Sequence, residues 1–458
     1  MSDSPSAFLF PLPLAPFERY MLADDRPGYP MTFVLRLQMA GRVRRSPFEA
    51  ALEESLARHP LLCAFVDHSR RRSPCWVSAG GNRPHVDWAA AAAPLRYPKC
   101  ERIDLASEVG LRIWVRQAAD TAQITCQFHH SCCDALGGLA FVGDLLAAYG
   151  MRTAAADRKP EFGTLDPRRL LSRGRIAART GSPMARVHSL WGTLCEAARW
   201  FAYRPVPLWS PTPAEPFQTT APPVLEIHTR TLDPVESTRL HAAAKQRGAT
   251  VNDVLLRDLF LAVNAWNERP GAERQRSRIR ISMPVNLRGP EDDQTPAANM
   301  VTMSFLTRAS RECGNRDSLL EGIRRETDWI KRSCRGRHFL RTLRMIFVLF
   351  GGLPRCVVGD RCLVTAVLSN LGDVSHSFAA RFPLASGRMV AGDLVLEGVA
   401  GVPPIRPYTS ASLMVSTYCD ATTVALRWDG RRLSAGDARE FVDRYTARLR
   451  ETLHRATT

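Results

Sequence analysis

Two histidines, two cysteines and an aspartate lie close together in the segment His129-His130-Ser131-Cys132-Cys133-Asp134. These side chains offer three kinds of chemistry: proton abstraction by an imidazole, nucleophilic attack by a thiolate, and metal binding. Metal binding is the poorest fit, because neighbouring residues on an extended chain point apart and do not easily converge on one ion. Nothing in the sequence marks Cys132 or Cys133 as activated. The segment therefore favours a histidine acting as a general base.

The residues before this segment predict a strand that ends at the histidines. Side chains alternate between the two faces of a strand, so Ile124, Cys126, Phe128 and His130 share one apolar face. Burial at the end of that face lowers the pKa of an imidazole and keeps it neutral, as a base that accepts a proton must be. So short a pattern also occurs by chance. On residue types alone, a loop histidine pair without a catalytic role is the more frequent outcome.

Elements that would position the segment alternate between helices and strands. In the first part of the chain, hydrophobic periodicity predicts helices over Pro16–Leu22, Ser46–Arg58 and Leu139–Tyr149, and strands over Met31–Met39, Ala64–His68, Leu111–Gln117 and Gln123–His129. The last two strands form a hairpin, and Ala89–Pro94 is an alanine-rich connection.

The second part of the chain repeats this mixture. Helices are predicted over Pro234–Arg247, Val251–Asn267, the basic stretch Ser318–Phe350 and Ser434–Leu453, and strands over Leu225–Leu232, Ile279–Val285, Val301–Leu306, Leu363–Leu368, Leu394–Val399, Leu413–Tyr418 and Thr422–Trp428. Thr250 can cap the second of these helices. Two lobes that each mix strands and helices indicate an α/β (α+β) fold.

Composition divides the chain into three parts. Residues 1–165 form an N-terminal lobe that carries the histidines, residues 166–223 form a basic, proline-rich connection, and residues 224–458 form a C-terminal lobe. The connection contains one predicted helix, Met184–Tyr203, which is basic and aromatic. Such a helix can contact a membrane surface peripherally, although packing on the protein with its arginines in solvent is the more frequent outcome.

Charge and cysteine content narrow the function classes. A net charge of +17 favours anionic partners, but no helix-turn-helix, zinc-finger or RNA-binding motif is present, so a nucleic acid is not expected. The twelve cysteines form no CxxC pair, and the N-terminus lacks a basic region followed by an apolar one. We expect reduced thiols and a cytoplasmic location. The most apolar run, Met345–Leu353, is half a bilayer span and predicts a buried helix segment.

Other short segments accompany the histidines, in an order that one superfamily shares. They are Arg58-His59-Pro60-Leu61-Leu62, Thr250-Val251-Asn252-Asp253-Val254-Leu255-Leu256, Met283-Pro284-Val285-Asn286-Leu287-Arg288, Asn299-Met300-Val301 and Leu368-Ser369-Asn370-Leu371-Gly372. Together with His129-His130-x-x-x-Asp134, which is similar to an HHxxxD signature, they resemble the condensation-domain superfamily. The resemblance is nearest to its stand-alone wax ester synthase and alcohol acyltransferase-like members.

This resemblance implies a fold and an activity. The fold would be two chloramphenicol-acetyltransferase-like lobes, each a mixed sheet with helices, with a substrate tunnel between them. The activity would be that of a thioester-dependent acyltransferase, which moves an acyl group from acyl-CoA or an acyl carrier protein to an alcohol or amine acceptor. The CoA or phosphopantetheine thioester is then a donor substrate, and no bound cofactor or metal is implied.

Carried over to this sequence, the resemblance implies distinct roles for the site residues. His130 is the implied catalytic base, and His129 shapes the end of the strand. Asp134 is implied to be structural and to pair with Arg288. Asn286 supports the same end of the site.

The tunnel and the stabilisation of an oxyanion involve a second group of residues. Ser369 and Asn370 are candidate donors to the oxyanion by position alone. Ala135 and Gly137 are further tunnel candidates. The superfamily usually has glycine at the place of Ala135. Compared with glycine, the alanine would narrow the tunnel or indicate a relaxed function.

Two alternatives to catalysis remain on sequence grounds. Ala135 and the basic composition are also compatible with a non-catalytic, condensation-like protein that binds a carrier protein or a lipid surface. Nucleic-acid binding through the arginine excess is a weaker hypothesis, and it predicts an affinity that falls steeply as the salt concentration rises.

Overall fold

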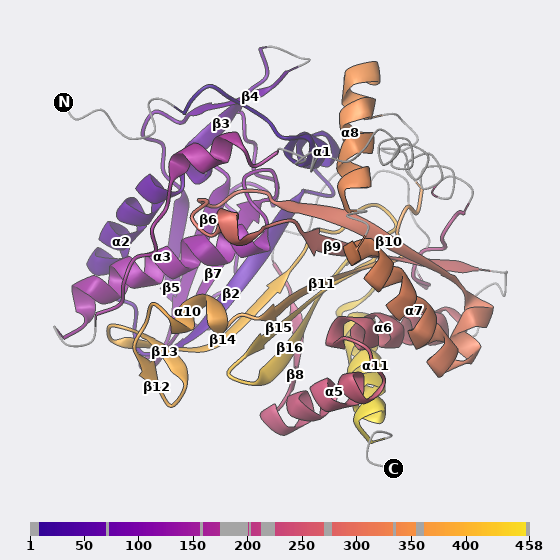
Figure 1. The fold of residues 1–458 in the computed structure, drawn as a ribbon. Helices are drawn as coiled ribbons and strands as arrows, with labels where there is room; N and C mark the ends of the chain where they lie inside the picture. Colours follow the sequence, from indigo (N-terminus) through magenta and orange to yellow (C-terminus); the bar gives the residue numbers. More distant parts are fainter. Residues whose placement is uncertain are drawn as a thin grey trace.

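Two mixed β-sheets, each covered by helices, form the centre of the molecule (Figure 1). The computed structural model describes residues 9–69, 73–155, 159–174, 200, 203–211, 225–269, 277–332, 336–353 and 361–454. The helix predicted over Met184–Tyr203 therefore lies almost entirely outside the described residues.

The first sheet has seven strands in the order β12-β13-β14-β2-β7-β6-β5. Their bounds are β12 Leu384–Ala385, β13 Arg388–Ala391, β14 Leu394–Val402, β2 Thr32–Ala40, β7 Thr121–His129, β6 Leu111–Gln117 and β5 His85–Ala90. Neighbours are antiparallel except β5 and β6, which are parallel. Helices α2 (Arg45–Arg58) and α3 (Ala135–Thr153) lie along this sheet (Figure 1) and join its apolar core.

The second sheet has six strands in the order β10-β9-β11-β15-β16-β8. Their bounds are β10 Val301–Ala309, β9 Arg278–Asn286, β11 Ala366–Asp373, β15 Ala411–Tyr418, β16 Ala421–Trp428 and β8 His228–Leu232. The pairs formed by β11 with β9 and with β15 are parallel, and the other pairs are antiparallel. Helices α5 (Pro234–Gln246), α6 (Val251–Asn267), α7 (Arg316–Arg332) and α11 (Ala435–His454) share its core.

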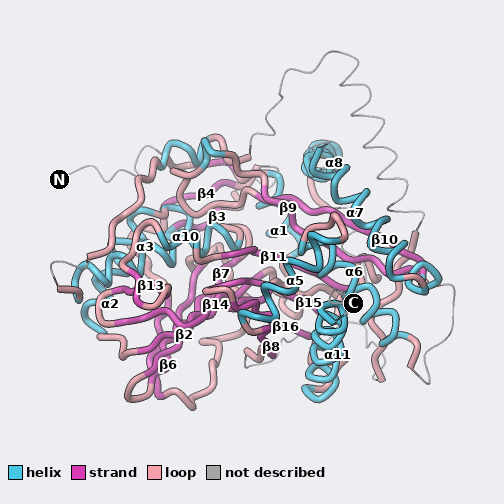
Figure 2. The backbone as a smooth tube through the Cα atoms, turned by 60° about the horizontal axis from the view of Figure 1, so that its bottom comes forward, coloured by secondary structure: helices cyan, strands magenta, loops and turns pink. Residues whose placement is uncertain are grey.

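Smaller elements lie around the two sheets. The short strands β1 (Leu12–Pro13), β4 (Cys75–Ser78) and β3 (Ala64–Asp67) form a separate antiparallel sheet. Helix α1 (Pro16–Asp24) packs against α8 (Gly336–Phe350), and α8 rises away from the sheets (Figures 1 and 2). A short helix, α10 (His376–Ala379), packs on α3.

The two sheets do not divide the chain into two contiguous parts. Strand β14 pairs with β2, with Val402 opposite Val34, so the chain from residue 384 to 402 completes the sheet of the first lobe. Pairing between residues so far apart in the sequence leaves no local signal. The boundaries predicted from the sequence at residues 165 and 223 therefore do not show that residues 384–402 join the first sheet.

Most predicted elements are present with small shifts of their ends. The helix over Val251–Asn267 is confirmed, and Thr250 caps it by accepting the Asp253 N–H at 3.3 Å. The prediction of a connection over Ala89–Pro94 was wrong at its start, because β5 continues through Ala90. Alanine gives little strand signal, and the parallel pairing with β6 supplies the missing information.

The basic stretch from Ser318 to Phe350 is two helices, α7 and α8, rather than one. The expectation that its apolar end is buried holds only in part. Phe347 is buried against α1, whereas Met345, Val348, Leu349 and Phe350 are exposed in α8. Periodicity shows that a helix is apolar, but it does not show how far along the helix another element covers it.

Candidate active site

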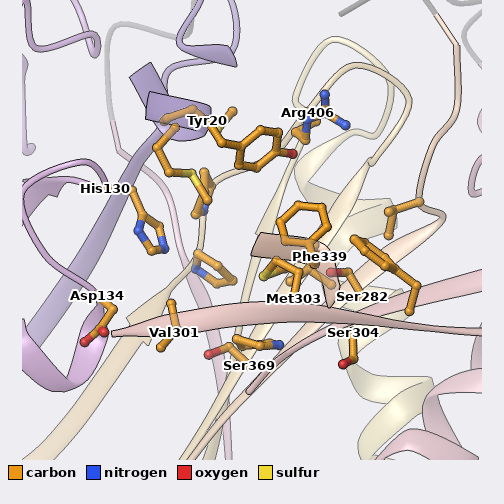
Figure 3. Close-up of a pocket in the computed structure, with 18 of the residues that line it drawn as sticks. Tyr20, His130, Asp134, Ser282, Val301, Met303, Ser304, Phe339, Ser369 and Arg406 are labelled. Atoms are coloured by element: carbon orange, nitrogen blue, oxygen red, sulfur yellow. The ribbon is translucent and has the colours of Figure 1, made fainter. Parts of the chain in front are cut away.

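A cavity of about 390 Å³ lies between the two sheets, a volume typical of small-molecule sites. The first lobe contributes residues from α1, β2 and the loop after β7, and the second lobe contributes residues from β9, β10, β11 and α8. Figure 3 shows His130 and Asp134 at one side of this cavity and side chains of the second sheet across from them. Its walls are mainly apolar and aromatic.

His130 reaches the cavity because β7 ends at His129 and the chain turns there. The His130 N–H donates to the Met31 carbonyl at 2.7 Å. The imidazole packs edge-on against Phe33 and Phe17, with ring centroids 5.1 and 5.9 Å away. Its Nδ1 atom is buried and has no hydrogen-bond partner among the described residues.

Burial lowers the pKa of His130 below its ordinary value of 6.5, although the nearby Asp134 carboxylate opposes this effect. The imidazole is therefore neutral at pH 7. A neutral imidazole on the wall of an apolar cavity can accept a proton from a bound hydroxyl or amine.

Asn299 fixes the backbone around His130. Its side-chain amide donates to the His130 carbonyl at 2.5 Å and to the Ser131 carbonyl at 3.0 Å. Asn299 belongs to a segment that carries the family resemblance, but no role was predicted for it. A lone asparagine before a strand shows only that it can hydrogen-bond, and its partners 168 and 169 residues away become visible only in the fold.

His129 faces away from the cavity and is fully buried. Its Nδ1 atom accepts the Ser131 N–H at 3.1 Å, so the ring proton sits on Nε2, which lies 3.7 Å from an Asp25 oxygen. That distance is too long for a hydrogen bond, and Nε2 has no hydrogen-bond partner among the described residues. Asp25 itself accepts the Met31 N–H at 2.9 Å. His129 therefore holds the turn after β7 through the Ser131 N–H.

Asp134 connects the histidine loop to both lobes. Its Oδ1 atom accepts the Gly137 N–H at 2.8 Å and caps α3. Its Oδ2 atom accepts from Arg288 Nη1 and from the Met300 N–H, each at 2.8 Å. Arg288 also donates to the Ala298 carbonyl at 3.0 Å. Both carboxylate oxygens are thus occupied by protein donors.

Of the other residues singled out from the sequence, Asn286, Ala135 and Ser369 line the cavity. Asn286 is exposed, and its side-chain oxygen accepts the Arg288 N–H at 3.1 Å. It stands where the cavity meets solvent. Ser369 is only 7% exposed and lies on β11, so its hydroxyl is inside the lobe interface.

Asn370 also lines the cavity, and its side-chain oxygen accepts the Gly372 N–H at 2.9 Å while its amide reaches Asn252 at 3.4 Å. Gly137 is not among the lining residues. A Cβ atom there would lie 2.9 Å from the Ala298 carbonyl oxygen, and its N–H already caps the helix. The close approach of two backbones, rather than a tunnel, requires glycine at this position.

The two cysteines of the motif are fully buried. Burial raises the pKa of Cys132 and of Cys133 well above its ordinary value, so both remain protonated and unreactive at pH 7. Within the described part of the chain, no cluster of three or more histidine, cysteine or acidic side chains has the arrangement of a metal site.

Two cavity residues carried no sequence signal. Tyr20 lies on α1, where burial raises the pKa of its phenol to about 12 and keeps the O–H protonated. Ser282 lies on β9 and is 1% exposed. In the sequence, Tyr20 is one aromatic residue in a short amphipathic helix and Ser282 is one polar residue in a strand. Only the meeting of the lobes brings them to the cavity.

Comparisons with known proteins give matches in structure but not in sequence. No family model and no curated protein sequence matches the chain. The TRI3 trichothecene 15-O-acetyltransferase from Fusarium sporotrichioides is 11% identical, with a TM-score of 0.66 over 96% of this chain and 95% of that one. The first condensation domain of the calcium-dependent antibiotic synthetase, in complex with a substrate analogue, is 14% identical, with a TM-score of 0.67 over 98% and 97% of the two chains.

A third structure is the starter condensation domain of the rhizomide synthetase RzmA, a mutant in complex with C8-CoA and Leu-SNAC. It is 13% identical, with a TM-score of 0.65 over 100% of this chain and 97% of that one. These matches confirm the fold class predicted from the sequence, two lobes of mixed sheets and helices. At such low identity the likeness concerns the fold, and the chemistry must be argued from the site.

Proposed function

We propose that the chain is an acyltransferase that moves an acyl group from a CoA or carrier-protein thioester to the hydroxyl or amine of an acceptor. The observation that carries the proposal is the imidazole of His130, kept neutral by burial on the wall of a cavity between the lobes. The acetyltransferase and condensation domains that share the fold support the same class of reaction.

In the proposed step, His130 takes the proton of the acceptor O–H or N–H while the oxygen or nitrogen attacks the thioester carbonyl carbon. The tetrahedral intermediate then expels the thiolate as the C–S bond breaks. The imidazolium returns its proton to that sulfur, so no proton is gained or lost. Ser369, which lines the cavity, is the proposed donor to the oxyanion.

Asp134 and Arg288 support this step without touching substrate in the proposal. Their ion pair fixes the loop that carries His130 to the end of β9. Proximity is the second contribution, because a cavity reached from both lobes holds donor and acceptor against one imidazole.

The donor thioester carries phosphates, whether it is CoA or a phosphopantetheine arm on an acidic carrier. A chain of net charge +17 attracts such anions over a distance. The mainly apolar cavity favours an aliphatic acyl group and an apolar alcohol, so we place a lipid or secondary-metabolite alcohol first among acceptors.

Product analysis tests the proposal most generally. The protein is incubated with mixed acyl-CoAs and a set of alcohols and amines, and the products are identified by mass spectrometry. New esters or amides that depend on the protein support acyl transfer. Tight binding of an acyl carrier protein or of vesicles, with no product from any pair, supports the non-catalytic alternative.

A peripheral membrane contact is a separate part of the proposal, and the tip of α8 is where we place it. Val348, Leu349 and Phe350 are 75%, 68% and 69% exposed. Exposed Arg344 lies one turn away, so apolar side chains and a positive charge face solvent together. Within the described residues, no helix is both long and apolar enough to cross a membrane.

Flotation with vesicles tests this contact. We expect the protein to float with vesicles that contain phosphatidylserine, and Leu349→Glu to reduce binding several-fold. Val235→Glu, at an exposed apolar position on α5, is the matched control and should not change binding. Equal loss of vesicle binding in both variants, or binding that does not depend on the vesicles' charge, contradicts a membrane contact at the tip of α8.

A further inference from the structure

Ser282 presents a buried polar atom to the cavity far from the histidine. Its side chain lines the cavity and is 1% exposed, and its Oγ has no hydrogen-bond partner among the described residues. Figure 3 shows it on the second sheet, beside Met303 and Phe339 and on the other side of the cavity from His130. A buried hydroxyl without a partner is costly to the free protein, so its presence calls for an explanation.

Strand register gives its place along the cavity. Val301 pairs with Asn286, and Phe305 pairs with Ser282, on neighbouring strands β10 and β9. The histidine loop is fixed at the Asn286 end, because Asp134 accepts from Arg288 just beyond β9. Four residues of strand separate Asn286 from Ser282, which corresponds to about 13 Å.

Apolar groups occupy the interval between these two ends. Met303 and Pro284 form the rung between them, and Val367 on β11 lies beside Ser282. Along this wall the cavity therefore has a polar reacting end, an apolar middle and a polar far end, while Tyr20 and Arg406 line other parts of it.

From this arrangement we infer that the substrate filling the far half of the cavity carries a second oxygen, a hydroxyl or a carbonyl, which hydrogen-bonds to Ser282 Oγ. The inference rests on the proposed function, because it takes His130 as the reacting end. It names a class of substrate: an aliphatic compound with one oxygen at the reacting end and another about ten carbons away, a separation estimated from the strand rise.

The second oxygen can belong to the acceptor or to the acyl group, and matched probes distinguish the two. For the acceptor, kcat/KM is measured with 1,10-decanediol and with 1-decanol. For the acyl group, it is measured with 10-hydroxydecanoyl-CoA and with decanoyl-CoA. We expect the oxygenated member of one pair to be preferred. Ser282→Ala should reduce that preference about threefold to tenfold, the range for one neutral hydrogen bond, by lowering kcat/KM more for the oxygenated member than for the plain one.

Thermal unfolding of the free protein gives an independent readout. Ser282→Ala removes a hydroxyl without a partner, so the unfolding midpoint should stay the same or rise. The matched control is Ser416→Ala on β15, which is 2% exposed and donates to the Val399 carbonyl at 2.7 Å. That variant should lower the midpoint and leave the preference between probes unchanged.

The outcomes separate this inference from the proposed function. If no thioester and acceptor pair reacts, the acyltransferase proposal fails. Calorimetry then measures the affinity of wild type and Ser282→Ala for the same probe pairs, and this comparison still tests whether Ser282 binds a second oxygen. If products form but neither oxygenated probe is preferred, or if Ser282→Ala weakens both members of a pair equally, the inference about Ser282 is overturned and the acyltransferase proposal stands.

Discussion

The Asp134 carboxylate accepts a hydrogen bond from the Arg288 guanidinium at 2.8 Å, across 154 residues of sequence. Asp134 is 2% exposed and Arg288 is 18% exposed, so the pair is largely withdrawn from water. Its position between the histidine loop and the end of β9 makes it a connection between the two lobes. A pair of this kind holds a site in register, and removing one partner leaves a buried charge uncompensated.

Arg288→Ala should therefore destabilise the protein. We expect the free energy of unfolding to fall by about 2–3 kcal/mol, at or below the low end for a broken buried pair because the arginine is partly exposed. Denaturant unfolding measures this loss. Asp134→Asn keeps an oxygen to cap α3, but it turns an amide N–H₂ toward the Arg288 and Met300 donors, so it should also lose stability. Unchanged stability in both variants would show that the pair does not brace the lobes.

The pH dependence of turnover follows from the lowered pKa of His130. The neutral imidazole is the active form, so kcat/KM should be flat above pH 6.5 and fall as the pH drops through the pKa of the buried histidine. A rate profile from pH 5 to 8.5 measures it. A profile that rises only well above pH 7 would require a different base.

The same shift links His130 to stability. The unfolded chain binds a proton near pH 6.5 that the folded imidazole binds only at lower pH, so stability is greatest above 6.5 and declines as the pH falls below it. We expect His130→Gln to lose less stability than wild type between pH 7.5 and 5.5. Equal losses in the two proteins would contradict burial of the imidazole.

The cysteines of the motif should be dispensable for chemistry. Because burial raises the pKa of both thiols, Cys133→Ala should retain turnover within a few-fold of wild type. In the native protein, Cys132 and Cys133 should also resist iodoacetamide, as mass spectrometry of the modified peptides can show. Rapid loss of activity on alkylation of either residue would contradict this expectation and support a mechanism with a thiolate nucleophile.

Ala135 lines the cavity at the first position of α3, so we expect its methyl group to limit the local width. Ala135→Gly should raise kcat/KM for bulky, branched acceptors relative to straight-chain ones, with a helix cost of up to about 1 kcal/mol. A competition assay between two such alcohols measures the ratio. A ratio that stays the same would show that Ala135 does not limit access.

How much of this site was predictable depended on whether its contacts were local. Strand alternation placed His130 on the apolar face of β7, next to Cys126 and Phe128, and the helix after Asp134 followed from periodicity. The ion pair with Arg288 came from resemblance alone, since no spacing connects residues so far apart.

Other features depended on tertiary packing and could not be predicted from the sequence. Asn299 holds the carbonyl of His130, and β14 enters the first sheet beside β2, through contacts that span much of the chain. Ser282 became notable only when its hydroxyl proved to be buried without a partner. Gly137, a tunnel candidate in the sequence, is not among the residues that line the cavity, and the sequence shows a glycine but not the Ala298 backbone packed against it.

Product formation by His130→Ala tests the central claim most directly. With an acyl-CoA and alcohol pair that wild type converts, the variant should lose about 10²–10⁴-fold in turnover, the usual contribution of a general base. Its thermal unfolding and circular dichroism should remain those of a folded protein. Near-wild-type ester formation by a folded His130→Ala variant would contradict the account.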